Sequence, residues 1–181
     1  MTQIDRVRDT DQPQTFPEPK QVMPREAAEK IVTDVLAKWQ STSEAEARGI
    51  ADELAEEFPD QARPDDFWHS QSSVAFRDFF VWGHDHDFGH GISRSGAMGP
   101  RPIEITSEAL RLGMLPADLK DKQVLDVGCW SGGDLLVLAG LGAQVTAMEE
   151  HPIAAKAARK LLELVGLNAP VIESSLFDDK Q

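Results

Sequence analysis

The chain of 181 residues contains a single cysteine, Cys129, and no tyrosine. One cysteine cannot form an internal disulfide, so a disulfide framework is excluded. The longest apolar run, Leu135 to Leu141, is far shorter than the roughly 20 residues that span a bilayer. The N-terminal segment MTQIDRVRDTDQPQ lacks the apolar core of a signal peptide. We therefore expect a soluble cytoplasmic protein with no membrane partner.

Positive charge is also scarce, because 18 Lys and Arg residues stand against 31 Asp and Glu residues, a net charge of −13. No segment forms a basic stripe with interleaved aromatic residues. This argues against a protein that grips phosphate backbones by itself. It leaves open a nucleic-acid substrate that is presented to a small patch. Hydrophobic residues make up 41% of the chain, enough for a packed core.

The sequence divides into three parts. Residues 1–23 are polar and Pro-containing, and we interpret them as a flexible tail. Residues 24–118 form a helical and aromatic-rich N-terminal cap. Residues 119–181 carry an α/β pattern.

Apolar residues in the cap recur at helical spacing from Pro24 to Trp39, which predicts a first helix. Ser43 and Glu46 form a capping-box pattern that predicts the start of a second helix, and the two helices are expected to pair as a hairpin. A short helix is expected over 107–112. The glycine-rich stretch before it has no assignable period.

The C-terminal part alternates buried strands with helices. This order predicts an α/β fold, a partial Rossmann-like parallel sheet of three strands joined by two right-handed crossovers. The expected strands are Gln123–Val127, Gln144–Met148 and Pro170–Leu176, and the expected helices are Gly133–Leu141 and Pro152–Val165.

The stretch DVGCWSGG follows the first of these strands, at the edge where ligands bind parallel sheets. Gly128 permits a sharp turn, and Gly132 permits close approach of a ligand to the next helix. The spacing departs from the G-x-G-x-x-G of dinucleotide sites. Asp126 would repel a diphosphate but can hold an ammonium group. Glu149, after the second strand, can accept hydrogen bonds from ribose hydroxyls. S-adenosylmethionine combines both groups.

At these residues the sequence resembles the class I S-adenosylmethionine-dependent methyltransferases. The segment VLDVGCWSG matches the first motif of the family, except for Trp130 where the family usually has glycine, and VTAMEEHP matches the acidic end of the second strand. The resemblance implies methyl transfer with S-adenosylmethionine as cofactor. The residues expected to bind the cofactor are Asp126, Gly128, Cys129, Trp130, Gly132, Glu149, Glu150, Ser175 and Leu176.

Each of these residues also has a plainer interpretation. The glycines can be ordinary turn residues, and Asp126 can be a helix cap. One of Glu149 and Glu150 can be a solvated loop residue. Cys129 can be a small packing residue, since no nearby base is evident.

The segment WGHDHDFGH suggests a metal site. In an extended strand His84 and His86 share one face. The zinc-hydrolase pattern H-x-H-x-D-H fails here, but a site built from His84, His86 and His90 stays open. Alternatively, these histidines line the mouth of a substrate site. As catalytic residues, His84, His86, Asp87 and His90 are only weak candidates.

The order of parts, an aromatic and His-rich segment followed by GISRSGAMG and the first motif, resembles relatives of tRNA wobble-uridine methyltransferases. This resemblance implies that residues 91–99 fold over the cofactor or substrate, with Arg94 or Arg101 pairing an acidic group. The methyl acceptor, a small molecule or RNA, stays undecided.

Methyltransferases of this class have seven strands, whereas three are recognisable here. Without a fourth strand, the edge at Val124–Val127 would be open. We therefore expect the N-terminal portion of a longer protein, or an edge covered by the cap, by another copy of the chain or by a second subunit. Two further hypotheses remain: a non-catalytic α/β binding or assembly module, and a metal-dependent hydrolase using the His84, His86 and His90 cluster.

Overall fold

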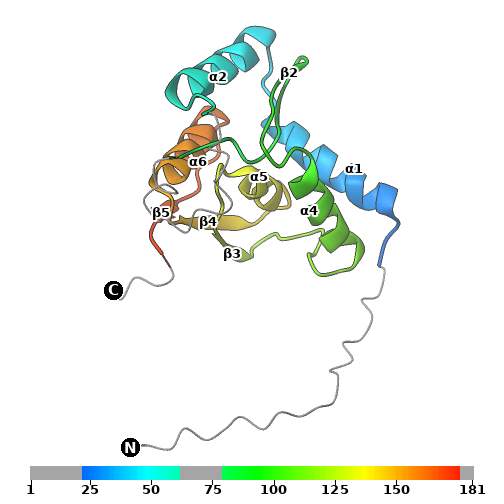
Figure 1. The fold of residues 1–181 in the computed structure, drawn as a ribbon. Helices are drawn as coiled ribbons and strands as arrows, with labels where there is room; N and C mark the ends of the chain where they lie inside the picture. The colour runs from blue at the N-terminus through cyan, green and yellow to red at the C-terminus, as the bar shows by residue number, and fades with distance from the viewer. Residues whose placement is uncertain (1–21, 62–78, 176–181) are drawn as a thin grey trace, which may run out of the picture.

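The computed structural model of the chain describes residues 22–61 and 79–175. These residues form an α/β structure with a parallel sheet, a small antiparallel hairpin and helices around both (Figure 1). The expected partial Rossmann-like fold is confirmed. The sequence predictions for residues 1–21, 62–78 and Leu176 lie outside the described residues. Among the helices that are described, none has the length and apolar character needed to cross a membrane.

Three strands form the parallel sheet, and their order across it follows their order in the sequence. They are β3 (Gln123–Val127), β4 (Gln144–Glu149) and β5 (Val171–Glu173). Asp126 pairs with Ala147 in the register, and Glu149 lies two residues further along β4. Parallel strands end at one edge of a sheet. Asp126 and Glu149 therefore lie near the same edge, as the sequence predicts.

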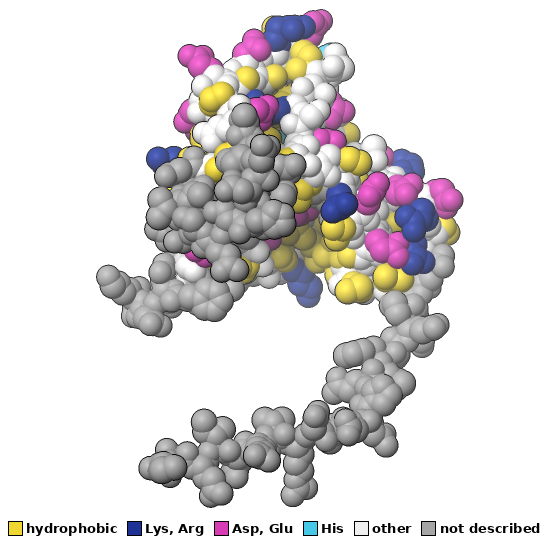
Figure 2. Space-filling model, viewed as in Figure 1, with side chains coloured by type: hydrophobic (Ala, Val, Ile, Leu, Met, Phe, Trp, Pro, Cys, Tyr) yellow, Lys and Arg dark blue, Asp and Glu magenta, His cyan; other side chains and the backbone are white. Residues whose placement is uncertain are grey.

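Two helices, α5 (Gly133–Gly140) and α6 (Pro152–Leu164), cover one face of this sheet (Figure 1). The sheet-facing surface of α6 is rich in alanine, which allows its backbone to approach the sheet closely. The opposite face carries Leu125, Val127 and Ile172, whose exposed fractions are 54%, 46% and 45%. Figure 2 shows hydrophobic side chains on the underside of the molecule, near the position of β3 in Figure 1. In the described part of the chain β3 pairs with β4 alone, so its other edge is open there.

The N-terminal region begins with α1 (Arg25–Leu36), a 3-10 turn at Ala37–Trp39 and α2 (Glu44–Glu57). Ser43 caps α2 by accepting a hydrogen bond from the Glu46 amide at 3.3 Å, which confirms the expected start. Pro24 is the N-cap of α1, so this helix begins one residue later than the sequence predicts. The expected helical hairpin is wrong: α1 packs on α4 (Arg101–Arg111) and α5, whereas α2 packs on the antiparallel hairpin and α6.

The glycine-rich stretch without a sequence period forms this antiparallel hairpin, β1 (His86–Gly89) and β2 (Ile92–Arg94). Its turn needs three consecutive left-handed residues, with φ of 89°, 57° and 73° at Gly89, His90 and Gly91. Glycine adopts this conformation without a steric penalty, which explains the composition of the turn. The helix expected over 107–112 begins six residues earlier, as α4.

The surface charge is uneven. Figure 2 shows acidic side chains over α2, and basic side chains near α4 interspersed with acidic ones. In this view the described surface offers no continuous basic patch.

Candidate functional site

The bend between β3 and α5 is built from left-handed residues. Gly128, Trp130 and Gly132 have φ of 80°, 47° and 86°. A Cβ added at Gly128 would meet nothing within 4 Å, so there is open space beside this residue. A Cβ at Gly132 would lie 3.3 Å from the Ala158 side chain, so this glycine lets the bend pack against α6. Gly128 thus faces space, whereas Gly132 faces protein.

Trp130 occupies a backbone conformation that disfavours residues with a side chain, by about 1–2 kcal/mol. Several contacts hold it there. Its amide donates to Glu149 Oε2 at 2.7 Å, its indole Nε1 donates to the Val81 carbonyl at 2.7 Å, and its ring stacks on Phe80 at 5.8 Å. These contacts explain how tryptophan is tolerated where glycine would be the simpler choice. Its side chain connects the bend to the N-terminal cap.

Asp126 lies at the end of β3 with one carboxylate oxygen, Oδ2, buried and without a hydrogen-bond partner among the described residues. An unsatisfied buried acceptor of this kind costs about 1–3 kcal/mol. The pKa of Asp126 is raised to about 6, mainly by burial and also by the Asp134 and Glu149 carboxylates, while His84 opposes the shift. Among the described residues Oδ2 therefore lacks a donating partner, which a bound ammonium group would supply.

Glu149 lies at the end of β4 and is only 5% exposed. Its Oε2 accepts from the Trp130 amide and its Oε1 accepts from the His151 amide at 2.8 Å. Each carboxylate oxygen has a second lone pair, so two acceptor positions are not used by these bonds. The residue expected to hold ribose hydroxyls therefore also fixes the backbone of the bend.

The remaining residues of the expected cofactor site have different surroundings. Cys129 is buried, and its pKa is raised to about 12 by burial first and then by the Glu149 and Asp126 carboxylates. This favours the packing interpretation over a reactive thiol. Glu150 is exposed and accepts a hydrogen bond from Ser175 Oγ at 3.0 Å. Leu176 lies outside the described residues.

The residues at the bend fit S-adenosylmethionine in three respects. The buried, unpaired oxygen of Asp126 matches the ammonium of its methionine end, and the space beside Gly128 leaves room for a ligand at the strand end. The acceptor positions left on Glu149 match hydroxyl donors. We call this site the cofactor bend and define it by Asp126, Gly128, Trp130, Gly132 and Glu149.

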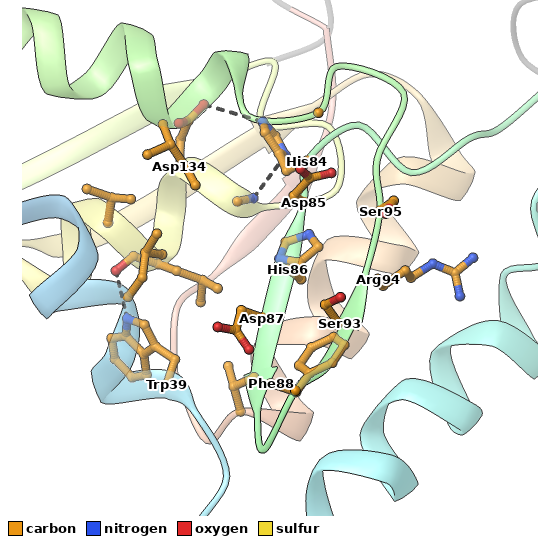
Figure 3. A pocket seen from close by; sticks show the side chains of 18 residues that line it. Trp39, His84, Asp85, His86, Asp87, Phe88, Ser93, Arg94, Ser95 and Asp134 are labelled. Carbon is orange, nitrogen blue, oxygen red and sulfur yellow. Dashed lines mark hydrogen bonds and ion pairs between the residues drawn. The ribbon is translucent and has the colours of Figure 1, made fainter. Parts of the chain in front are cut away.

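A cavity of about 350 Å³ lies on the other side of the α5 N-terminus, beneath the β1–β2 hairpin (Figure 3). None of the residues of the cofactor bend lines it. Gly133 and Asp134 at the start of α5 form one wall, and apolar side chains from the 3-10 turn and α5 form another. The polar side chains in its lining are His84, Asp85, His86, Asp87, Ser93, Arg94, Ser95 and Asp134. We call it the hairpin cavity.

His84 connects the segment before the hairpin to the α5 N-terminus. Its Nδ1 accepts a hydrogen bond from the Gly133 amide at 3.2 Å and is 3.3 Å from Ser131 Oγ. Because Nδ1 is an acceptor, the proton of the neutral ring is on Nε2, which lies 3.6 Å from Asp134 Oδ2. His84 is therefore arranged to hold two segments together. In this state it has no free nitrogen with which to accept a substrate proton.

His86 is 5% exposed, and its Nε2 is buried without a hydrogen-bond partner among the described residues. Its ring stacks on Phe88 at 6.3 Å and meets Trp82 edge-on at 5.5 Å. Burial lowers the pKa of His86 to about 3, and the neighbouring His84 and Arg94 lower it as well. His86 is therefore neutral at any ordinary pH and has an unused ring nitrogen.

The histidine metal cluster is not formed. His84 and His86 approach each other at 6.2 Å between ring centres, but His90 is exposed on the hairpin turn, where its ring bonds the Ser41 carbonyl at 3.2 Å. Across the described residues no group of three His, Cys, Asp or Glu side chains is placed to hold a metal ion. The metal-dependent hydrolase hypothesis is therefore not supported. Three of the four weak catalytic candidates, His84, His86 and Asp87, line the hairpin cavity.

Arg94 and Arg101 are the two arginines of which one was expected to pair an acidic group at the cofactor or substrate, and Arg94 is instead held by groups of the chain itself. Its guanidinium donates to the Phe58 carbonyl at 2.8 Å, contacts Asp60 at 3.3 Å and lies 4.7 Å over the Trp82 ring. Figure 3 shows the guanidinium directed away from the labelled histidines, toward α2. It therefore secures the hairpin against α2. Arg101 is exposed on α4.

Asp85, Ser131 and Asp134 are site residues that the sequence reasoning missed. Asp85 Oδ1 accepts from the Gly96 amide at 2.8 Å, which holds the end of the hairpin against the cavity. The sequence did contain one indication of the hairpin. Aromatic rings and histidines stand at every second position, the period of two that marks a strand, and all four are buried: Trp82, His84, His86 and Phe88. Asp134 carries only the weak signal of an acid in a first helical turn.

Comparisons with known proteins add little. No protein-family model matches the chain. No curated protein matches it. Among solved structures, a protein-L-isoaspartate O-methyltransferase is similar to it with a TM-score of 0.40 and 15% sequence identity. The match covers 84% of this chain and 42% of that chain, so this chain spans less than half of that structure.

Proposed function

We propose that the chain binds S-adenosylmethionine at the cofactor bend and serves methyl transfer from it. The observation that carries the proposal is the buried Oδ2 of Asp126, which has no partner among the described residues. Glu149 and the open space beside Gly128 at the same edge of the sheet support it. A carboxylate this poorly satisfied is costly unless a ligand completes it.

The residues have distinct tasks in this proposal. Asp126 holds the ammonium group, and Glu149 receives ribose hydroxyls while fixing the Trp130 amide. Gly128 keeps the strand end free of a side chain. When bound, the sulfonium supplies an activated methyl carbon, so the protein's main contribution is to position donor and acceptor. Positioning of this kind contributes several kcal/mol, about 7 in good cases.

Calorimetric titration with S-adenosylhomocysteine tests the proposal. Saturable binding to the wild-type chain is expected, with a loss of at least about 100-fold in affinity for Asp126→Asn, because the ammonium then lacks a charged partner. Asp118→Asn is the matched control: Asp118 is exposed and also accepts a backbone hydrogen bond, from the Lys120 amide at 2.9 Å. Absence of binding to the wild-type chain would favour the non-catalytic binding module.

Two classes of methyl acceptor are open, a small molecule and RNA, and we propose the small molecule. The acidic surface over α2 and the interspersed charges near α4 favour the small molecule (Figure 2). Incubation of the chain with methyl-labelled S-adenosylmethionine and either RNA or a metabolite extract separates the two. Label appearing in RNA would contradict this preference.

A further inference from the structure

We propose that the hairpin cavity binds a small organic cation with an apolar body. The proposal does not depend on methyl transfer, because it concerns a different set of residues. The cavity volume of about 350 Å³ is within the range of about 300–1,000 Å³ that is typical of small-molecule sites. Carboxylates, histidines and aromatic rings meet in its lining.

The sign of the ligand charge follows from the lining. Asp85, Asp87 and Asp134 contribute three carboxylates, against the single guanidinium of Arg94. Arg94 is already held by the Phe58 carbonyl and Asp60 and points toward α2 (Figure 3). The Gly133 amide at the helix start is already bonded to His84. Arg94 Nε is also buried and has no hydrogen-bond partner among the described residues, so one donor stays unused. An anion would nevertheless face the three like charges of the carboxylates.

The carboxylates differ in how much of their capacity is used. Both oxygens of Asp87 accept hydrogen bonds at 2.9 Å, from the Gly89 amide and from Gln40. Asp85 uses Oδ1 for the Gly96 amide. Asp134 Oδ1 accepts from Thr106 at 3.4 Å, and its Oδ2 lies 3.6 Å from His84. Asp85 and Asp134 thus keep more acceptor capacity for a ligand than Asp87 does.

His86 is the independent observation that points to a ligand. It is almost fully buried, it lines the cavity, and its Nε2 has no partner among the described residues. A buried ring nitrogen without a partner is unfavourable unless a ligand supplies a hydrogen-bonding group. In the tautomer with the proton on Nδ1, Nε2 is an acceptor, and a ligand N–H group then meets its need and carries the charge that the carboxylates favour. The Trp39 and Phe88 rings in the lining supply apolar contact for its body.

Three probes of the same shape test the charge preference: phenethylamine, 2-phenylethanol and phenylacetate, a cation, a neutral molecule and an anion. Each is titrated into the full chain, and the histidine ring signals are followed by NMR. Phenethylamine is expected to bind saturably, to shift the His86 ring signals and to bind at least about tenfold more tightly than phenylacetate.

Variants locate the binding. Asp134→Asn is expected to weaken phenethylamine binding about five- to tenfold, because one carboxylate charge is lost while the Thr106 hydrogen bond is retained. Asp118→Asn is the control and is expected to leave the affinity unchanged. The dispersion of the NMR spectrum reports whether each variant is folded. Equal affinity for phenylacetate, binding that leaves the His86 signals unmoved, or no saturable phenethylamine binding would each overturn the proposal.

Discussion

The cofactor bend and the hairpin cavity lie on two sides of the α5 N-terminus, and each contains a buried polar side-chain atom without a partner among the described residues. Besides Arg94 Nε in the cavity, these atoms are Asp126 Oδ2 at the bend and His86 Nε2 in the cavity. Burial shifts their pKa values in opposite directions, to about 6 for Asp126 and about 3 for His86. In both cases burial disfavours the charged form.

The difference lies in how close each group is to ionisation at neutral pH. Asp126 is largely ionised at pH 7, and its Oδ2 has no partner among the described residues, so it favours a cationic ligand group. His86 stays neutral and can only exchange a hydrogen bond, so the charge preference of the cavity comes from its carboxylates instead. The two sites also influence each other, because the Asp134 carboxylate contributes to the raised pKa of Asp126.

The largest expected effect is that a substitution at either site weakens the binding of the ligand of that site and leaves the other ligand nearly unaffected. Asp126→Asn should weaken S-adenosylhomocysteine binding at least about 100-fold and change phenethylamine binding by less than about threefold. His86→Phe, which keeps a buried ring beside Phe88, should do the reverse, with a loss of at least about tenfold for phenethylamine. Calorimetry with both ligands on both variants gives the four values. If one variant lost affinity for both ligands to the same degree, the two ligands would share one site, and the comparison would fail.

The two glycines that flank the bend should respond differently to alanine. A Cβ at Gly133 would lie 2.5 Å from His84 Cγ, so Gly133→Ala should displace the His84 ring and cost about 2–3 kcal/mol. Gly128→Ala meets open space but needs a positive φ, so it should cost about 1–2 kcal/mol. Urea unfolding measures both free energies. A larger loss at Gly128 would contradict the account of the His84 contact.

The two sites should also differ in how ligand affinity depends on pH. Asp126 must be ionised to hold an ammonium group, so S-adenosylhomocysteine should bind about tenfold more weakly at pH 5 than at pH 7. Above about pH 7 the affinity should level off. His86 stays neutral over this range, so its hydrogen bond in the cavity should not change. Calorimetric titrations at half-unit pH steps measure the profile, and a flat profile would argue against an ammonium at Asp126.

The same pKa shift makes a stability prediction of known sign. The pKa of Asp126 is higher in the folded chain than in the unfolded chain, so the folded state binds more protons between about pH 4 and 6. The stability contributed by this group is present at low pH and is lost as the pH rises through about 6. Asp126→Asn should therefore gain stability relative to the wild type as the pH rises from 4 to 7. Unfolding midpoints of the two proteins at both pH values provide the check.

The smallest expected effect concerns Cys129. Burial and the carboxylates of Glu149 and Asp126 raise the pKa of its thiol to about 12, so almost no thiolate is present at pH 8. A thiol reagent should label the native chain far more slowly than the urea-unfolded chain. Because the chain has one cysteine, the signal is unambiguous. Equal labelling rates would show that the bend opens readily.

The regular part of the fold could be predicted from the sequence because its pattern is local. The bounds of β3 agree with the prediction, and α5, β4 and α6 differ from it by one residue at their ends. The hairpin could not be assigned, because its strands are short and its turn is glycine-rich. The packing of α1 on α4 could not be predicted either, since it joins segments about 75 residues apart in the sequence.

The candidate sites show the same limit. Asp126 and Glu149 could be placed at one edge because parallel strands end together. Glu149 also fixes the Trp130 amide. This second role depends on the left-handed backbone of Trp130, which no sequence pattern predicts. The position of His151 could not be predicted from the sequence either. His151 is fully buried, caps α6 by accepting from the Ala154 amide at 3.2 Å and bonds the Phe79 carbonyl at 3.0 Å.

The most direct test of the central claim is the titration of the Asp126 carboxyl carbon by NMR, with and without S-adenosylhomocysteine. We expect a pKa of about 6 in the free chain, and a clear fall on saturation, because an ammonium group favours the ionised carboxylate. Methylthioadenosine, which lacks the amino-acid end, should leave this pKa nearly unchanged. An unchanged Asp126 pKa in the chain saturated with S-adenosylhomocysteine would contradict the account.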